Sequence, residues 1–305
     1  MRTAFVGAVE GSAIALDALI SAGMAPGLVV TLPLETAGRH SDFADIEPYA
    51  RAGGSDLLRV ADINSSMALD ALRTFEPDLV LVIGWSQICK KPFRSIAHLG
   101  NVGFHPAALP RLRGRAVIPW TILLGEHTTG ASLFWLDDGI DSGPILLQEP
   151  IAVADDETAR SLYSKQTGAL AKLLPRAVEL IRAGDPPRIP QDESRAVYCA
   201  KRTAEDGQID WREPADEVVR LIRAVGDPYP GAFTGASGRR LFIDEATVFP
   251  DSHRYLGLVG QVQSHTPDGF IVRCGDGRCI YITAWRMDGG RERPRLHGKL
   301  GAVTI

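Results

Sequence analysis

The strongest constraint on the fold is the alternation of apolar runs with amphipathic segments over the first 150 residues. Residues 78–85, DLVLVIGW, are nearly all apolar, which is typical of a central parallel strand buried on both faces. Residues 12–23 have helical spacing and end in glycine, and residues 65–76 begin with serine, a good helix cap. The alternation predicts an α/β fold with a doubly wound, mostly parallel sheet. Strands are expected at 3–9, 27–32, 56–60, 78–85, 101–105, 129–136 and 144–151, the last two being antiparallel neighbours.

The pattern changes near residue 184. A long helix is expected over 156–183, in which Pro175 should produce a kink or a break. The Pro-rich polar stretch 184–194 is the best domain boundary. One helix over 214–228 follows, and then about five short strands separated by turns such as PDG and GDG, which favour a small barrel similar to an OB-fold. The predicted domains are 1–184 for the α/β domain, 185–205 for a linker and 206–305 for the barrel.

Bulk properties exclude several classes of protein. The 305 residues are 45% hydrophobic and 23% charged with a net charge of −4, so the chain reads as globular and has no overall attraction for polyanions. No apolar run reaches the roughly 20 residues of a membrane helix, and no signal-peptide pattern is seen, so a cytoplasmic location is expected. The four cysteines contain no CxxC pair, which disfavours zinc, and they are expected to stay reduced.

The best candidates for chemistry are His105 and Asp141. In an open α/β sheet, ligands bind at the carboxyl ends of the strands, and His105 lies where the chain leaves a strand. Prolines stiffen the loop that follows it, whereas Gly139 and Gly143 allow tight turns around Asp141. A carboxylate beside a histidine makes an acid/base pair. A histidine and an aspartate also meet by chance in many folds, so spacing alone leaves a structural role open.

Three long motifs, HPAALPRLRGRAVIPW, DDGIDSGPI and KRTAEDGQIDW followed by LIRAVGDPYPGAFT, resemble those of the 10-formyltetrahydrofolate-dependent formyltransferases. This family includes methionyl-tRNA formyltransferases and enzymes that formylate nucleotide-linked amino sugars. The resemblance covers nearly the whole chain in the family's order. It implies an α/β catalytic domain followed by an OB-like barrel, formyl transfer to a primary amine, 10-formyltetrahydrofolate as co-substrate, and no metal.

The resemblance also implies catalytic residues, with one departure from the family's pattern. The family uses an Asn–x–His pair and a distant aspartate, which match His105 and Asp141 here, but Gly103 stands in place of the asparagine. Asn101 is a tentative substitute, although in a regular strand it lies about 13 Å from His105 along the chain. A bulge at Gly103 would bring it closer. The alternatives are a donor from another loop, Ser86 or Gln87, a backbone N–H, or an altered activity.

The resemblance further assigns binding residues. The loop after the central strand would hold the folate, with Trp85 alternatively packed in the core. Arginines suit a phosphate or carboxylate of the acceptor, although such arginines are also often solvated or paired with neighbouring carboxylates. The predicted folate contacts are Trp85, Ser86, Gln87, Ile88, Asp137, Asp138 and Gly139, and the predicted acceptor contacts are Arg115, Arg113 and Glu10.

Charge distribution bears on the acceptor. A tRNA-directed enzyme is expected to carry basic loops and a basic second domain. Residues 35–47 are instead acidic, and from residue 206 onward 13 basic residues balance 13 acidic ones. We therefore expect a small amine, most of all a nucleotide-linked amino sugar, and no nucleic acid or membrane partner. Methionyl-tRNA and a non-catalytic folate- or nucleotide-binding module are the alternatives, and the oligomeric state, including a homodimer, stays open.

Overall fold

The computed structural model describes residues 1–39, 42–287, 290 and 292–301, which form two compact units. The first unit contains residues 1–117, 127–153 and 163–200, and the second contains 118–126, 154–162 and 201–305. Most of the segment predicted as a linker, up to residue 200, therefore packs with the first unit.

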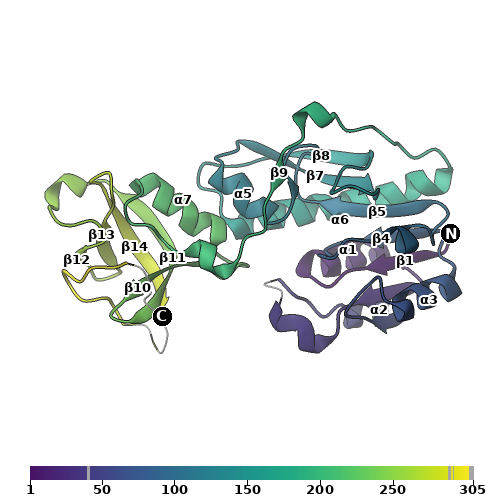
Figure 1. The fold of residues 1–305 in the computed structure, drawn as a ribbon, viewed down its shortest axis with the longest axis horizontal. Helices are drawn as coiled ribbons and strands as arrows, with labels where there is room; N and C mark the ends of the chain where they lie inside the picture. Colours follow the sequence, from purple (N-terminus) through teal and green to yellow (C-terminus); the bar gives the residue numbers. More distant parts are fainter. Residues whose placement is uncertain (40–41, 288–289, 291, 302–305) are drawn as a thin grey trace. The chain divides into compact units, whose positions relative to one another are not determined.

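A seven-stranded sheet in the order β3-β2-β1-β4-β5-β7-β8 forms the centre of the first unit (Figure 1). The strands from β3 to β5 are parallel, and β7 and β8 add to the sheet in antiparallel fashion. The predicted α/β fold with a mostly parallel sheet is confirmed. The strands are β1 Thr3–Val6, β2 Leu28–Thr31, β3 Asp56–Arg59, β4 Leu79–Val82, β5 Gly100–His105, β7 Thr128–Trp135 and β8 Ile145–Ala152.

Helices cover both faces of this sheet. Apolar residues of α3 and α4 pack on the face formed by Val80, Val82 and their neighbours. Helices α1 and α6 are joined by a hydrogen bond from the Gly11 amide to the Tyr163 hydroxyl at 2.8 Å. Pro175 lies inside α6 without breaking it, because buried leucine, valine and isoleucine side chains hold the helix on the sheet on both sides of the proline. The helices are α1 Glu10–Ser21, η1 Leu34–Arg39, α2 Glu47–Ala52, α3 Ser66–Phe75, α4 Lys91–Arg94 and α6 Ala159–Ala183.

A short parallel pair joins the end of the first unit to the loop after β5. Strand β6, Arg113–Gly114, pairs with β9, Tyr198–Cys199. Gly114 has a φ of 105°, and a Cβ there would lie 2.5 Å from the Cys199 carbonyl oxygen, so only glycine fits this close approach. The 3-10 turn η2, Glu193–Arg195, precedes β9.

The second unit contains a five-stranded antiparallel sheet in the order β10-β11-β14-β13-β12. Both edges make bridges to the C-terminal segment, Gly235 to Gly301 and Gln261 to Lys299. The same segment thus meets the two edges of the sheet, as closure into a small barrel requires. The elements are α5 Val117–Leu123, β10 Ala232–Ala236, β11 Arg239–Phe249, β12 Val262–His265, β13 Phe270–Arg273 and β14 Cys279–Met287, with α7 Ala215–Val225 and the turns η3 Ala204–Gly207 and η4 Ser252–Arg254.

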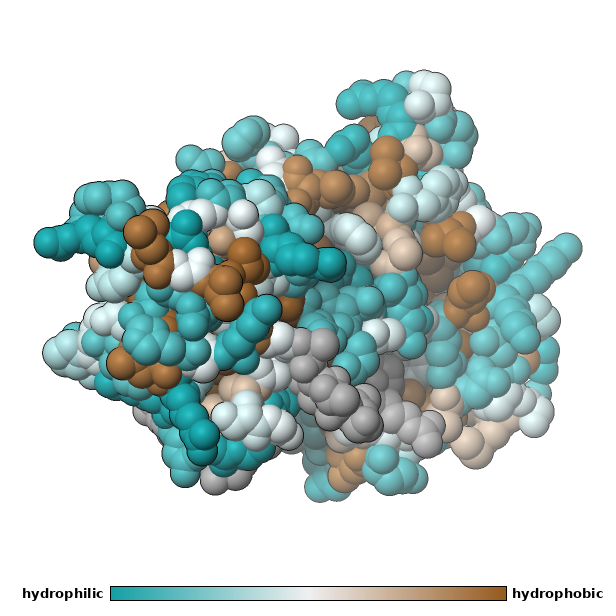
Figure 2. Space-filling view, turned by 60° about the vertical axis from the view of Figure 1, so that its left-hand side comes forward, coloured by the Kyte–Doolittle hydropathy of each residue, from teal (hydrophilic) through white to brown (hydrophobic). Residues whose placement is uncertain are grey.

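The described residues contain no helix that is both long and apolar enough to span a membrane. Hydrophilic residues cover most of the face in Figure 2, and hydrophobic ones lie among them in small groups. All four cysteines are free thiols. Burial raises the pKa of the Cys89 and Cys274 thiols to about 12, which makes both poor nucleophiles near neutral pH.

Candidate active site

The structure brings His105 and Asp141 into contact. His105 is the last residue of β5 and is 4% exposed. Its Nδ1 atom lies 3.4 Å from Oδ2 of Asp141, and its Nε2 atom lies 2.7 Å from the carbonyl oxygen of Leu112. Because a carbonyl oxygen only accepts, Nε2 must carry the proton of that hydrogen bond. The same Asp141 oxygen accepts from the Gly114 amide at 2.8 Å, which fixes the carboxylate beside the imidazole.

Left-handed backbone conformations gather around this pair. Leu112, Ala116 and Asp141 have φ angles of 57°, 54° and 50°, although none of them is a glycine. Each such residue costs about 1 kcal/mol or more, and the conformation persists only where the surroundings impose it. Strain of this kind concentrates at functional sites, so its presence on both loops that meet His105 marks this region as the candidate active site.

Gly103 lies in an unbroken part of the sheet. It pairs with Val82 and Phe134, and neither ladder shows the bulge considered above. A Cβ atom on Gly103 would come within 2.8 Å of Leu136 Cδ2 and 3.0 Å of the Phe134 ring. Apolar side chains therefore occupy the space into which the family's asparagine would project.

Asn101 is held away from the chemistry by its own hydrogen bond. Its side chain is buried, and Nδ2 donates to the carbonyl oxygen of Arg94 at 2.8 Å. Arg94 is the last residue of α4, so the amide satisfies a carbonyl that the helix leaves unpaired. This contact gives Asn101 a structural role, and the tentative catalytic assignment finds no support in the geometry.

The two other proposed amide and hydroxyl donors lie in the loop after β4. The Gln87 side chain accepts from the Ile63 amide at 3.0 Å and donates to the Ala61 carbonyl at 2.6 Å. Both ends of Gln87 are thus used to join this loop to the one after β3. Ser86 is exposed.

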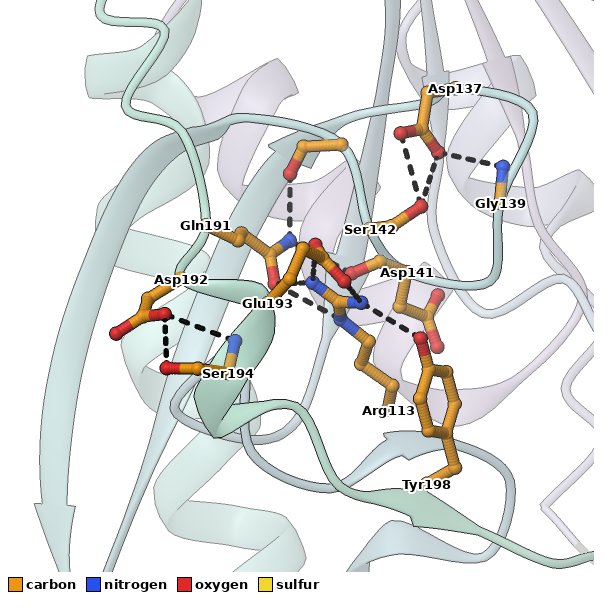
Figure 3. Close-up of polar contacts among 11 residues, drawn as sticks. Arg113, Asp137, Gly139, Asp141, Ser142, Gln191, Asp192, Glu193, Ser194 and Tyr198 are labelled. Carbon is orange, nitrogen blue, oxygen red and sulfur yellow. Dashed lines mark hydrogen bonds and ion pairs between the residues drawn. The ribbon is translucent and has the colours of Figure 1, made fainter.

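Arg94 connects the two segments predicted to hold the folate. Its guanidinium donates to the Cys89 carbonyl, directly after the first segment, and pairs with the Asp138 carboxylate in the second. Asp137 accepts from the Gly139 amide at 3.0 Å and from the Ser142 hydroxyl, which closes the second segment into a tight loop (Figure 3).

These two segments also suit a flat, partly apolar ligand. The first segment exposes Ile88 at 69%, and Ile140, directly after the second segment, is 53% exposed. The Trp85 Nε1 atom is a buried donor with no partner among the described residues, and Trp85 itself packs against the apolar layer under the sheet. An unpaired buried donor and exposed apolar side chains are what a heterocyclic ring with hydrogen-bonding edges needs.

Arg113 does not face a ligand. Its side chain is fully buried, and its five N–H donors contact Gln191, Glu193 and Tyr198 at 2.6 to 3.2 Å. Hydrogen bonds with Glu193 raise the pKa of the guanidinium, and the same bonds lower the pKa of the Glu193 carboxyl. With every donor used, Arg113 has none left for an acceptor phosphate, and its role is structural.

Arg115 and Glu10 occupy different settings. Arg115 is exposed, and its backbone amide donates to the Cys199 carbonyl at 3.2 Å. Glu10 is half-buried in the first turn of α1, where its backbone amide donates to the Asp42 carbonyl at 2.9 Å. Unlike Arg113, the Arg115 side chain is thus at the surface.

Sequence reasoning missed Gln191, Glu193 and Tyr198, which surround Arg113, and the contact of Gln191 with Asp141. All three lie in the segment 185–205, which was predicted as a linker. A polar, Pro-rich sequence gives no sign that its side chains make such contacts. No group of three or more potential metal ligands is found within the described ranges.

Comparison with known families places the chain. The model of the formyl transferase family matches residues 15–178, and that of the formyl transferase C-terminal domain matches residues 201–294. A methionyl-tRNA formyltransferase of Anaeromyxobacter sp. (strain K) is 33% identical over 291 residues, covering 95% of this chain and 93% of the relative. That of Syntrophus aciditrophicus (strain SB) is 34% identical over 278 residues, with coverages of 90% and 88%.

Solved structures share the fold. HypX from Aquifex aeolicus, in complex with tetrahydrofolic acid, gives a TM-score of 0.67 at 17% identity, covering 99% of this chain and 46% of its own. The chain thus spans about half the length of HypX. WlaRD, a sugar 3N-formyl transferase, gives a TM-score of 0.66 at 16% identity, with coverages of 93% and 97%. A methionyl-tRNA formyltransferase from Clostridium thermocellum gives 0.58 at 18% identity, with coverages of 81% and 93%.

Proposed function

The chain belongs to the family of 10-formyltetrahydrofolate-dependent formyltransferases, and from this premise we propose that His105 and Asp141 catalyse formyl transfer to a primary amine. The observation that carries the proposal is the contact between the His105 ring and the Asp141 carboxylate, held by two loops with left-handed residues. Strain at a histidine–carboxylate pair in this family is best explained by catalysis.

The donor supplies an activated formyl group, which leaves N10 of the folate as the acceptor nitrogen bonds to the formyl carbon. We assign donor binding to the two segments joined by Arg94, residues 85–88 and 137–139. The exposed Ile88, the exposed Ile140 directly after the second segment, and the unpaired Trp85 Nε1 atom fit the pterin ring. The Asp138 carboxylate, paired with Arg94, fixes the position of the second segment.

His105 carries out the proton transfers of the reaction. The attacking amine must lose a proton, and the departing folate nitrogen must gain one. Asp141 orients the ring through Nδ1. Nε2 is therefore the atom that faces the substrates, once it releases the Leu112 carbonyl. With the amine proton on Nε2, the ring also donates to the formyl oxygen as negative charge develops there. Gly103 has no side chain that could do so.

For the acceptor we propose a small amine with an anionic group, such as a nucleotide-linked amino sugar, with Arg115 contacting the phosphates. Support comes from the exposure of Arg115 and from the equal numbers of basic and acidic residues beyond residue 206. Methionyl-tRNA is the second candidate, because curated relatives at 33% and 34% identity carry that name. The expectation that excludes nucleic acid is therefore not supported.

The test measures tetrahydrofolate release from 10-formyltetrahydrofolate with dTDP-3-aminofucose, methionyl-tRNA and free amino acids as acceptors. His105→Ala and Asp141→Ala should each lower turnover by about 100- to 10,000-fold with the fold intact. Arg115→Ala should raise the KM for the nucleotide sugar and leave that for the folate unchanged. Near-normal turnover in His105→Ala would refute the catalytic assignment. Activity with methionyl-tRNA alone, falling steeply with added salt, would favour the second candidate.

A further inference from the structure

We propose that Gln191 is a positioning residue for Asp141 and that the buried Arg113 fixes the orientation of its amide. This inference rests on the proposed function, because it concerns the carboxylate that orients His105. Gln191 lies outside every catalytic or binding segment predicted from the sequence, and Figure 3 shows it between Arg113 and the loop that carries Asp141.

The first observation is the contact between Gln191 and the backbone of the Asp141 loop. Its Nε2 atom donates to the carbonyl oxygen of Asp141 at 2.8 Å and to that of Gly143 at 2.7 Å. These two bonds use both N–H groups of the amide. They hold the backbone on either side of Ser142, where Asp141 has its left-handed φ of 50°.

The second observation is that the amide cannot turn over. Gln191 Oε1 accepts from Nε and Nη2 of Arg113 at 3.2 and 2.9 Å. A flipped amide would place its N–H groups against the guanidinium and its oxygen against two carbonyl oxygens, so four hydrogen bonds would become repulsive contacts. The Arg113 charge therefore selects one orientation, in which both N–H groups point at the Asp141 loop.

The third observation is that Arg113 is itself fully hydrogen-bonded. Glu193 accepts from the guanidinium with both carboxylate oxygens, at 2.6 and 2.8 Å, and the Tyr198 hydroxyl accepts at 2.9 Å. Bidentate pairing with a carboxylate fixes the plane of a buried guanidinium. The chain of contacts thus runs from Glu193 through Arg113 and Gln191 to the backbone of Asp141.

The consequence is geometric. Asp141 needs a left-handed backbone to direct Oδ2 at both the Gly114 amide and the His105 ring. Without the Gln191 bonds, the loop relaxes toward an ordinary φ and the carboxylate moves. A displacement of about 1 Å at a catalytic group costs about 100-fold in rate. We therefore expect Gln191→Ala to lower kcat about 10- to 100-fold, with the KM for 10-formyltetrahydrofolate unchanged.

Two variants and one control test this role. Gln191→Glu has the same shape and still accepts from Arg113, but it turns an oxygen toward the two carbonyls of the loop, so it should also slow turnover. Ser194→Ala removes a hydrogen bond to Asp192 in the same turn, a contact that does not reach Asp141, and should behave as wild type. Unfolding midpoints identify any variant that fails to fold.

A readout that needs no acceptor is the ¹⁵N spectrum of the His105 ring, assigned by comparison with His105→Ala. The signals should move in Gln191→Ala in the direction in which Asp141→Asn moves them, and should stay in place in Ser194→Ala. The double variant Gln191→Ala/Asp141→Asn should be no slower than Asp141→Asn alone, because both act through one group.

The inference is overturned if Gln191→Ala leaves the His105 signals and kcat at wild-type values, or if its effect on the rate multiplies with that of Asp141→Asn. Failure of the proposed function has a different signature. In that case Asp141→Asn itself turns over normally, whatever Gln191→Ala does.

Discussion

Replacing Gly103 with asparagine restores the family's pattern and tests whether the site has room for it. The structure predicts that it has not. A Cβ at this position lies 2.8 Å from Leu136 Cδ2 and 3.0 and 3.1 Å from two atoms of the Phe134 ring. Carbon atoms prefer separations of about 3.5 to 4.0 Å. Leu136 has a flexible end that can yield, but Phe134 is only 3% exposed and packs against Leu109 and Ile145.

The magnitude follows from three contributions. Overpacking costs about 1 to 3 kcal/mol, and an amide without partners in an apolar space adds about 1 to 3 kcal/mol. Removing a glycine from the unfolded chain returns about 0.4 to 1 kcal/mol. We therefore expect Gly103→Asn to lower the free energy of unfolding by about 1 to 6 kcal/mol and not to increase the rate.

Urea denaturation of wild type, Gly103→Asn and Gly103→Ala separates these contributions. Alanine carries the steric cost without the amide and should lose about 1 to 2 kcal/mol. Combining Gly103→Asn with Leu136→Ala opens space and should return part of the loss. If Gly103→Asn proves as stable as wild type and faster in formyl transfer, the space beside Gly103 is accessible and the steric argument is wrong.

Three further predictions concern Arg94, Glu193 and the two buried thiols. Arg94→Gln, which loses the ion pair with Asp138, should raise the KM for 10-formyltetrahydrofolate several-fold and change kcat little. If KM and kcat are impaired to the same extent, the assignment of Arg94 to folate binding is refuted. Arg113 lowers the pKa of the Glu193 carboxyl below its ordinary 4.5, so the stability from this pair is present above pH 4.5 and is lost as the pH falls through the lower folded pKa. In Glu193→Gln, the free energy of unfolding should therefore fall less steeply as the pH is lowered. Iodoacetamide at pH 8 should modify Cys89 and Cys274 only after unfolding, as mass spectrometry of labelled peptides would show, since burial raises both thiol pKa values to about 12.

The α/β architecture could be predicted because its signals are local. The apolar run 78–85 identified β4, although the ladder covers only Leu79–Val82, since apolar residues continue past the last paired position. Ser65 was expected to cap a helix, and its hydroxyl accepts from the Ala68 amide at 3.3 Å. The contact between His105 and Asp141 followed from family resemblance and strand ends.

The surroundings of the site could not be predicted, because they depend on the path of a segment without regular structure. Nothing in the sequence indicates that Gln191 returns to Asp141 or that Arg113 is buried, and an arginine after two prolines reads equally well as a ligand contact. Asn101 was misleading for a similar reason. Its partner is the carbonyl end of the four-residue helix α4, which has too short a pattern to recognise.

The loss of the asparagine changes what the remaining groups must supply. Removing one side-chain donor to a developing oxyanion costs about 100- to 1,000-fold in kcat in enzymes that rely on it. Under the proposed mechanism, the apolar side chains of Phe134 and Leu136 beside Gly103 lower the local polarity, so an N–H that the His105 ring donates to the oxyanion acts more strongly than it would in water. The apolar wall thus offsets part of what the missing amide costs, provided that Asp141 keeps the ring aligned. An enzyme without the asparagine therefore depends more on the position of Asp141 than one that has it. This dependence gives a physical reason for the buried Arg113 and for Gln191 to hold the loop that carries Asp141.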